Sequence, residues 1–480
     1  MKKNKTIINL MYQGVYQLVK TLLPLITIPI VAHSLGAGGV GQYSFANSIV
    51  QYFLLIAALG VPLYGTKVIA ERTGNPEKLS RAFWDIETFS IILSGITFAV
   101  AVLIGLVWQF NNVYFVQLLL IIGAGLDVSW LFMGVEDFKK ISLANLAVTL
   151  TTFVLILLLV NNQDDVLVYA GIMTGGIVAT QLILWLFVGK YVARPDDIKI
   201  SEIIFHLRRS FTFFIPQIGI VFYTNLNKTM LGMFTPDKSM VGMFANGILM
   251  TSAIITLVGT IDTVLLPKIT KLVTHGETVR SYEVIRDVLN LQIYITLPVA
   301  LGLGAVADKF VPWFFGSTFK GLEMVLPIIS MIVIVIPAGM TLSKQFLIPA
   351  NRVKDYNLTV YAGAVISVIL NVLLIPIWGI IGAALVSVIV ETLIWAVRVY
   401  DFKKKTRYSY AWRSVLVQLI ISVLMCAVVK CLFVDSHPSA LVTVFQVVIG
   451  GSIYLIGTTL LRVNPFLTLF VHRNKSKTVT

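Results

Sequence analysis

The sequence predicts an all-α polytopic membrane protein, and three features support this class: the composition, the long apolar windows and the placement of positive charge. Of the 480 residues, 57% are hydrophobic and 12% are charged, and the mean hydropathy is +0.88. Soluble domains carry about 25% charged residues. The chain is therefore too apolar to be a soluble globule of this length.

Fourteen windows are long and apolar enough to cross a bilayer, which takes about 20 residues of helix. They cover residues 8–33, 42–66, 86–108, 112–133, 141–160, 166–189, 211–233, 241–266, 291–311, 323–348, 358–375, 379–397, 414–433 and 440–461. Spans around Pro62, Pro298 and Pro337 are expected to be kinked or broken. The last two windows have few polar residues, so they either shelter a lipid tail or only pack.

The loops between the predicted spans fall into two alternating sets, one on each side of the membrane, and the two sets differ in their content of lysine and arginine. One set, which includes both termini, holds most of the 37 Lys and Arg residues, whereas the other holds only Lys238, Lys309 and Lys320. Roughly a quarter of the residues in the first set are basic against roughly 6% in the second, which is the bias of cytoplasmic loops. We therefore expect both termini to be cytoplasmic, in a multi-pass protein.

The same distribution explains the net charge of +14 without nucleic acid. The excess is divided among short loops that would face anionic lipid headgroups, so no nucleic-acid partner is expected. Cys426 and Cys431 lie in one apolar span at a spacing that favours packing over a disulfide or a metal site. No metal or cofactor is predicted.

An internal echo indicates two lobes. Gly41-Gln-Tyr43 opens the second window and Gly242-Met-Phe244 opens the eighth, each followed by a Pro and a Lys near the end of the window. A hydrophilic linker lies at 190–210 between the halves. We expect pseudo-symmetric six-helix lobes at 1–197 and 198–400, followed by helices 13 and 14 and a cytoplasmic basic tail at 401–480. Two halves around a central site are a common transporter plan.

Lys20 is the most informative residue, because it stands in the middle of the first window. A lysine there costs roughly 2.5 to 3.5 kcal/mol on insertion scales, so something must compensate it. At helical spacing it shares one face with four other polar residues, Asn9, Gln13, Gln17 and Thr27. One polar face opposite an apolar one is typical of a helix that lines a watery cavity.

Further polar stripes recur on the second, seventh and eighth windows. They comprise Ser44, Asn47, Ser48 and Gln51; Gln217, Thr224 and Lys228; and Ser252, Thr256, Thr260 and Thr263. We expect the four stripes to meet where the lobes meet. The predicted substrate-binding residues are Lys20, Gln13, Gln17, Asn47, Gln51, Gln217, Thr224 and Lys228.

Each polar feature also has a structural interpretation. Lys20 could form an ion pair with Asp127 or with another buried acid, and the amide stripes could simply join helices, since interhelical hydrogen bonds are worth about 0.6 kcal/mol on average. Lys344 and Lys430 are read as residues that extend toward the membrane surface. A structural pairing of Glu391 with Arg398 is favoured over proton coupling.

Two segments resemble a known family. Leu370-Asn-Val-Leu-Leu-Ile-Pro-Ile-Trp-Gly-Ile-Ile-Gly-Ala-Ala384 is similar to a motif of bacterial polysaccharide transporters. Leu35-Gly, Gly41-Gln-Tyr-Ser-Phe-Ala46 and Leu59-Gly-Val-Pro-Leu-Tyr-Gly65 resemble the opening of Wzx-type oligosaccharide flippases. Wzx-type flippases belong to a superfamily that also contains peptidoglycan lipid flippases and multidrug and toxin extrusion transporters. The resemblance implies about fourteen helices, two lobes and alternating access, in the bacterial cytoplasmic membrane.

The resemblance implies as cargo a polyprenyl-pyrophosphate-linked oligosaccharide, moved to the outer leaflet for capsule, exopolysaccharide or O-antigen-type synthesis. Polysaccharide assembly proteins are then possible partners besides membrane lipids. Stripping sugar hydroxyls of water costs roughly 2 to 7 kcal/mol each, so a polar path is needed. A diphosphate would need cations, which Lys20 and Lys228 would supply.

Other classes remain open from sequence. A membrane glycosyltransferase would need acids or bases on a surface loop, and we find neither paired catalytic carboxylates nor a nucleophile motif, so the protein is not expected to be an enzyme. A multidrug exporter would favour acidic cavity residues, which the first helix lacks. A peptidoglycan-precursor flippase is closer still. The energy source and the glycan are not readable from the sequence.

Overall fold

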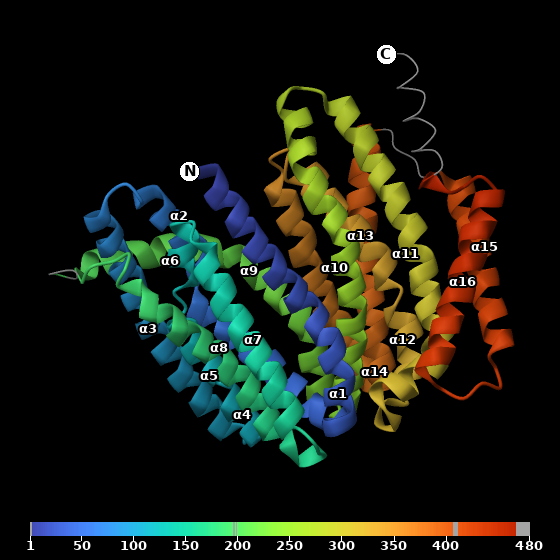
Figure 1. Cartoon of the computed structure of the whole chain (residues 1–480), viewed down its shortest axis with the longest axis horizontal. Helices are drawn as coiled ribbons and strands as arrows, with labels where there is room; N and C mark the ends of the chain where they lie inside the picture. Colours follow the sequence, from blue (N-terminus) through green and yellow to red (C-terminus); the bar gives the residue numbers. More distant parts are fainter. Residues whose placement is uncertain (1, 195–196, 198, 407–410, 467–480) are drawn as a thin grey trace. The chain divides into compact units, whose positions relative to one another are not determined.

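The computed structural model describes residues 2–194, 197, 199–406 and 411–466, and all regular structure within them is helical (Figure 1). The predicted all-α class is thus confirmed. Most of the predicted basic tail lies outside the described residues. Contacts divide the chain into two compact units, which we call unit 1 (Met1–Gly232 and Asp237–Gly242) and unit 2 (Met233–Pro236 and Met243–Thr480).

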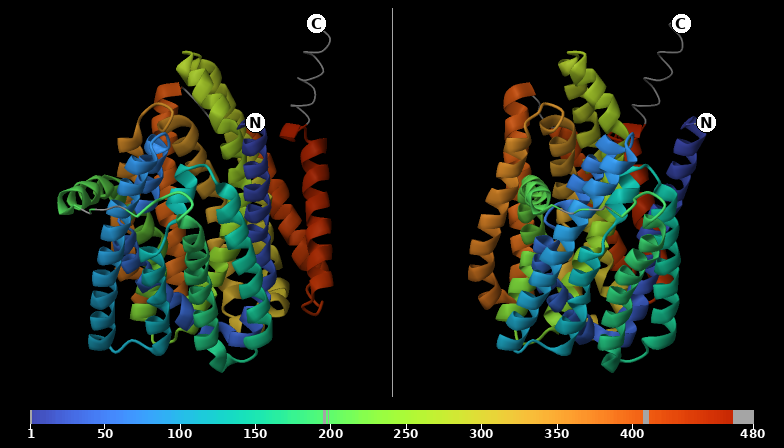
Figure 2. Two further views of the ribbon diagram at one scale, coloured as in Figure 1. Left: turned by 60° about the vertical axis from the view of Figure 1, so that its left-hand side comes forward. Right: turned by 90° about the vertical axis from the view of Figure 1, so that its left-hand side faces the viewer.

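Unit 1 is built from one long bent helix, a layer of shorter helices beside it and most of α9. Its helices are α1 (Lys2–Ala58), α2 (Val61–Arg72), α3 (Pro76–Val107), α4 (Asn112–Gln117), α5 (Leu119–Gly125), α6 (Ser129–Gly134), α7 (Phe138–Leu159), α8 (Val166–Val188) and α9 (Ile200–Phe234), with a 3-10 turn at Gln163–Asp165. Helix α1 packs along α7, as the views in Figure 2 show.

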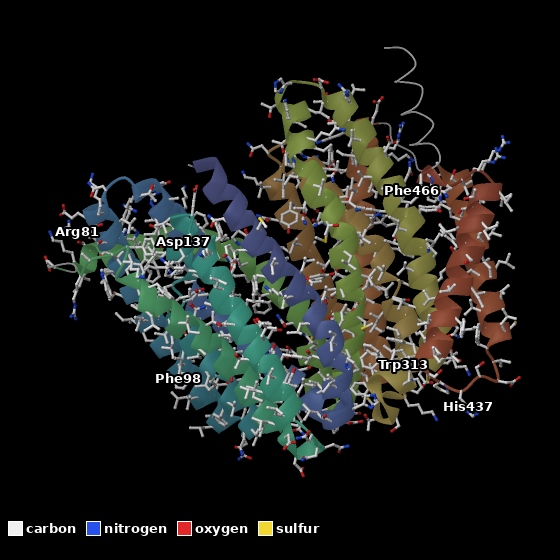
Figure 3. All side chains as sticks on the ribbon, in the orientation of Figure 1. Arg81, Phe98, Asp137, Trp313, His437 and Phe466 are labelled. Carbon is white, nitrogen blue, oxygen red and sulfur yellow. The ribbon has the colours of Figure 1, made fainter. Side chains whose placement is uncertain are left out.

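Unit 2 holds the remaining helices. They are α10 (Ser239–Thr274), α11 (Thr278–Phe315), α12 (Leu322–Ile329), α13 (Ile332–Thr341), α14 (Val353–Thr406), α15 (Trp412–Leu432) and α16 (Ala440–Leu460), with a 3-10 turn at Ser317–Phe319 and a π-helix at Leu342–Leu347. Trp313 and His437 lie near one end of this unit and Phe466 near the other (Figure 3).

Eleven helical segments in the described residues are long and apolar enough to cross a membrane. The longest two each cover two of the predicted spans, and the backbone breaks inside them at glycines with positive φ, Gly36 (64°) and Gly379 (53°). Helix α9 covers the predicted 211–233 span but is less apolar than the eleven. The protein is therefore a multi-pass membrane protein, while the exact count of fourteen stays a prediction.

Helix α9 is tied to unit 1 at its first turns. The Ser210 hydroxyl donates to the Leu59 carbonyl at 2.7 Å, and the Tyr64 hydroxyl and His206 Nδ1 share a hydrogen bond of 2.6 Å. Burial, with Arg72 nearby, lowers the pKa of His206 to about 4, so this imidazole is neutral. The predicted lobe boundary at 197/198 stays a prediction, and by packing α9 belongs with the first helices.

Gly41 and Gly242, the glycines of the predicted internal repeat, lie close together in unit 1. A Cβ on Gly41 would lie 1.7 Å from the Lys238 carbonyl oxygen, and one on Gly242 would lie 2.2 Å from the Ala37 oxygen and 2.8 Å from the Gly41 nitrogen. Only a residue without a side chain permits so close an approach of two backbones. The two glycines that suggested the repeat therefore mark one helix crossing.

Candidate functional site

The first part of α1 exposes two different faces. One is apolar and leaves more than half of each side chain uncovered at Met11, Val15, Leu18 and Leu22. The other is polar, with Gln13, Gln17 and Lys20 exposed. Each polar residue lies two positions after an apolar one, which is about 200° around a helix of 3.6 residues per turn. The polar face thus lies opposite the lipid-compatible face.

Lys20 is exposed on that polar face. No carboxylate of the described residues lies within 4 Å of its ammonium, and the Tyr16 ring is its aromatic neighbour, 5.9 Å from Nζ to the ring centroid. Asp127, the predicted alternative partner, instead accepts a hydrogen bond from the Ser129 backbone N–H. The ion pair considered for Lys20 is therefore not formed with Asp127 here.

Other polar residues of α1 join it to its neighbour. The Asn9 side chain donates to the Glu136 carbonyl oxygen at 2.7 Å, and the Lys139 ammonium lies 5.4 Å from the centroid of the Tyr12 ring. These contacts fasten the start of α1 to the turn before α7. Asn9 thus has the interhelical role that was the structural alternative for the stripe, whereas Gln13, Gln17 and Lys20 make no such bond within the described chain.

The second part of α1 carries Asn47 and Gln51, both half-buried. Ser48 between them is fully buried and accepts from the Thr229 hydroxyl of α9 at 2.9 Å, while the Tyr52 and Thr229 hydroxyls lie 3.1 Å apart. This hydroxyl cluster holds the second part of α1 against α9. The polar stripe therefore combines residues that bond across to α9 with the half-buried Asn47 and Gln51, whose side chains make no hydrogen bond within the described residues.

Helix α9 carries the three predicted residues that were assigned to the second lobe. Gln217 and Lys228 are half-buried and Thr224 is exposed. The Thr224 hydroxyl donates to the Ile220 carbonyl of its own helix at 2.9 Å. Its proton is therefore not available to a ligand in this conformation. In the part of the chain that is described, Lys228 has no carboxylate within 4 Å, so it resembles Lys20 in this respect.

The structure places the predicted site residues in three groups, all in unit 1: the polar face of the first part of α1, the pair on its second part, and the stripe on α9. Within each group the residues share a helix face. No hydrogen bond between the groups is formed by these residues in the described structure. The hydroxyls of Tyr52 and Thr229, which do join α1 to α9, were not singled out from sequence.

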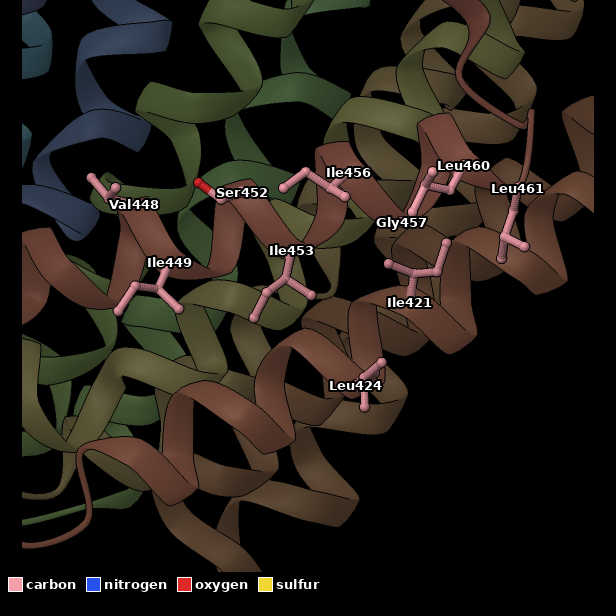
Figure 4. Close-up of a pocket in the computed structure, with 10 residues that line it drawn as sticks. All are labelled: Ile421, Leu424, Val448, Ile449, Ser452, Ile453, Ile456, Gly457, Leu460 and Leu461. Carbon is pink, nitrogen blue, oxygen red and sulfur yellow. The ribbon is translucent and has the colours of Figure 1, made fainter.

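An apolar groove of about 570 Å³ lies along α15 and α16 (Figure 4). All of its lining is apolar except one serine: Ile421, Leu424, Val448, Ile449, Ser452, Ile453, Ile456, Gly457, Leu460 and Leu461. This surface suits a lipid tail and suits ordinary lipid contact equally. Both interpretations made for the last two helices therefore stay open.

The fold and the polar face together define an all-α, multi-pass membrane protein with unpaired cationic groups inside apolar helices. The chain belongs to the polysaccharide biosynthesis protein family, which it matches over residues 7–273. It is 24% identical over 398 residues to a protein of Escherichia coli strain K12 that carries the provisional description of O-antigen transporter; the match spans 80% of this chain and 94% of that protein.

Solved structures show the same fold at low sequence identity. The lipid II flippase MurJ in an inward closed conformation gives a TM-score of 0.72 at 15% identity, over 94% of this chain and 98% of that one. An inward-facing multidrug resistance transporter of the MATE family gives 0.56 at 16% identity, over 80% and 96%. These similarities confirm the predicted fold class. The identity of the cargo has to be argued from the residues of the candidate site.

Proposed function

We propose that the protein is a flippase that moves a polyprenyl-pyrophosphate-linked oligosaccharide from the inner to the outer leaflet of the bacterial cytoplasmic membrane by alternating access. The product would serve capsule, exopolysaccharide or O-antigen-type synthesis. The family, the description of the E. coli relative and the shared fold with a lipid flippase support this class. On this proposal no covalent bond changes, both termini are cytoplasmic, and polysaccharide assembly proteins receive the cargo.

The unpaired ammonium of Lys20 is the observation that carries the proposal. A buried or membrane-embedded cation normally has a carboxylate partner, since desolvating it alone costs several kcal/mol. Lys20 has none within 4 Å in the described residues, and it faces away from the apolar surface of its helix. An anionic headgroup is the ligand that would complete this face, with Gln13 and Gln17 as hydrogen-bonding partners for sugar or phosphate oxygens.

Two alternatives within the same fold predict a different site. A multidrug exporter for organic cations would place carboxylates on the cavity face, and the first part of α1 has none between Tyr12 and Ala32. A peptidoglycan-precursor flippase would share the need for cations, because its cargo is also a lipid-linked sugar. Mass spectrometry of the lipid-linked glycan that accumulates when this protein is depleted would separate these cargoes.

Substitutions of Lys20 test the site directly. We expect transport activity to fall in the order wild type, Lys20→Arg, Lys20→Gln, Lys20→Glu, because arginine keeps the charge, glutamine removes it and glutamate repels a diphosphate. Protein abundance in the membrane should change little for glutamine. Full transport by a normally expressed Lys20→Gln variant would defeat the headgroup role, and a joint loss of abundance and activity would indicate a structural ion pair.

A parallel variant tests the second cation. Lys228→Ala should impair transport and leave abundance near normal, whereas Lys430→Ala, an exposed lysine at the end of α15, serves as the matched control and should behave as wild type. Unimpaired transport by Lys228→Ala would confine the site to α1.

A further inference from the structure

Unit 1 contains a second polar centre that is separate from the polar face of α1. Its main member is Glu87 on α3, whose side chain is fully buried. Neither carboxyl oxygen of Glu87 has a hydrogen-bond partner, and no Lys, Arg or His nitrogen lies within 4 Å of it, among the described residues. An ionised carboxylate in such surroundings would cost many kcal/mol, and groups of this kind take up a proton instead.

The packing of α3 against the broken α5–α6 segment brings Asp127 to Glu87. On one side Gly125 lies against Ser94 of α3, where an added Cβ would approach the Ser94 Cβ to 2.7 Å. On the other side Trp130 stacks on Phe83 of α3, with ring centroids 5.3 Å apart. Glu87 lies between Phe83 and Ser94 on α3, as Asp127 lies between Gly125 and Trp130.

Asp127 differs from Glu87 in having hydrogen-bond donors. The Ser129 backbone N–H donates to its Oδ1 at 2.9 Å, and the Gln181 side chain of α8 lies near this carboxylate. The Trp185 indole N–H, one turn after Gln181, donates to the Leu126 carbonyl at 2.9 Å and holds the break in place. A donor therefore favours the ionised form of Asp127, whereas no donor reaches the Glu87 carboxyl in the described part of the chain.

The charges around Glu87 favour its neutral form. Asp127 is the neighbouring acid among the described residues, and a negative charge on it opposes a second negative charge on Glu87. The helices packed against α3 are α1, α2, α4 and α5, and among the described residues none of them places a Lys, Arg or His nitrogen within 4 Å of the Glu87 carboxyl. The cations nearest in the chain and on α2, Arg81 and Arg72, act on Asp85 instead. Two neighbouring carboxyls in different environments divide their roles, so that one holds the proton and the other the charge.

We propose that Glu87 is an exchangeable proton site, protonated in this conformation and paired with the ionised Asp127 across the broken helix. Helix breaks at depth in transporters are where small cations bind. Opening of the junction of α3, α5, α6 and α8 would hydrate Glu87 and release its proton, and closing it would require the proton back. The conformational equilibrium of unit 1 would therefore depend on pH, whatever the cargo.

Infrared difference spectroscopy on the purified full-length protein tests the protonation directly. The carbonyl band of a buried protonated carboxylic acid should be present at neutral pH, absent from Glu87→Gln and retained in Glu77→Gln, the exposed carboxyl on the first turn of the same helix. Asp127→Asn should shift the band without removing it. Persistence of the full band in Glu87→Gln would overturn the assignment.

Thermal melting gives a second and independent reading. A carboxyl that is neutral when folded and ionised when unfolded contributes stability that is complete below about pH 4.3 and falls as the pH rises. Between about pH 5 and 8 the melting temperature of wild type should therefore decrease, with a slope at least about twofold smaller in Glu87→Gln. Equal slopes would contradict the proposal. Na⁺ and choline at equal ionic strength distinguish a proton site from a metal site. If Na⁺ stabilised wild type more than choline did, and Glu87→Gln removed this difference, Glu87 would bind a metal cation and the proton assignment would be overturned.

Discussion

At the scale of residues, the charges of unit 1 are accommodated in different ways according to their surroundings. Among the described residues, Lys20 is exposed with no carboxylate within 4 Å, Glu87 is buried with no hydrogen-bond donor, and Asp137 near the end of the unit is paired. The Lys140 ammonium lies 3.1 Å from Asp137, and the Tyr191 hydroxyl donates to the same carboxylate oxygen. Arg81 and Asp137 lie at one end of the unit (Figure 3). A paired charge stabilises the fold, whereas unpaired ones indicate ligands.

The Asp137 cluster provides a stability prediction. Although burial raises the pKa of Asp137, hydrogen bonds from Tyr191 and Lys140 outweigh it and hold the pKa below its usual value. Asp137→Asn should therefore lower stability by about 1.5 to 3 kcal/mol at pH 7. The difference between the two proteins should shrink as the pH falls below about 3.9, since both side chains are then uncharged.

Melting temperatures of both proteins across this pH range would check the prediction. Asp164→Asn, on the exposed turn before α8, is the control and should change little. A pH-independent difference would show that shape and not charge accounts for the loss.

At the scale of elements, glycines decide where long helices bend and how closely they cross. Gly36 and Gly379 break α1 and α14 through backbone angles that other residues rarely adopt. Gly41 and Gly242 act through their missing side chains, because the two backbones touch there. Hydropathy placed the ends of the predicted spans within a few residues of both breaks, whereas the crossing itself depends on distance in space.

The crossing predicts that an added methyl group is not tolerated. Gly41→Ala would place a Cβ on the Lys238 carbonyl, so the backbones must separate, at a cost of about 3 kcal/mol. The melting temperature and the membrane abundance should both fall. Gly95→Ala on α3, where nothing lies within 4 Å of the new Cβ, is the control and should be neutral or slightly stabilising. Similar melting temperatures for the two variants would show that the crossing is loose.

At the scale of the whole molecule, the distribution of lysine and arginine predicts orientation. Loops near Lys78, Arg208, Arg280 and Lys404 belong to the basic set, and the turn at Asp237 to the other. Single cysteines at these positions, in a protein lacking Cys426 and Cys431, should be protected from a membrane-impermeant thiol reagent in intact cells, except at Asp237, which should react. Labelling of the Lys404 loop from outside would rule out the fourteen-span map.

The sequence by itself determined the class of the protein, most of its spans and the polar face of α1. These properties add up along the chain: each apolar residue contributes to transfer into the bilayer, and residues three or four apart share a helix face whatever lies beside them. Lys20 was recognisable for this reason, as a charge inside an apolar window.

Only the tertiary structure decided which polar residues have partners. Asn9 and Asn47 belong to similar stripes, yet Asn9 bonds to the turn before α7, while the half-buried Asn47 side chain makes no hydrogen bond within the described residues. The sequence does show Glu87 as an acid inside an apolar window. Its lack of donors among the described residues and its approach to Asp127 arise only where α3 packs on a broken helix. Such pairings join residues far apart in the chain, and packing in three dimensions selects them.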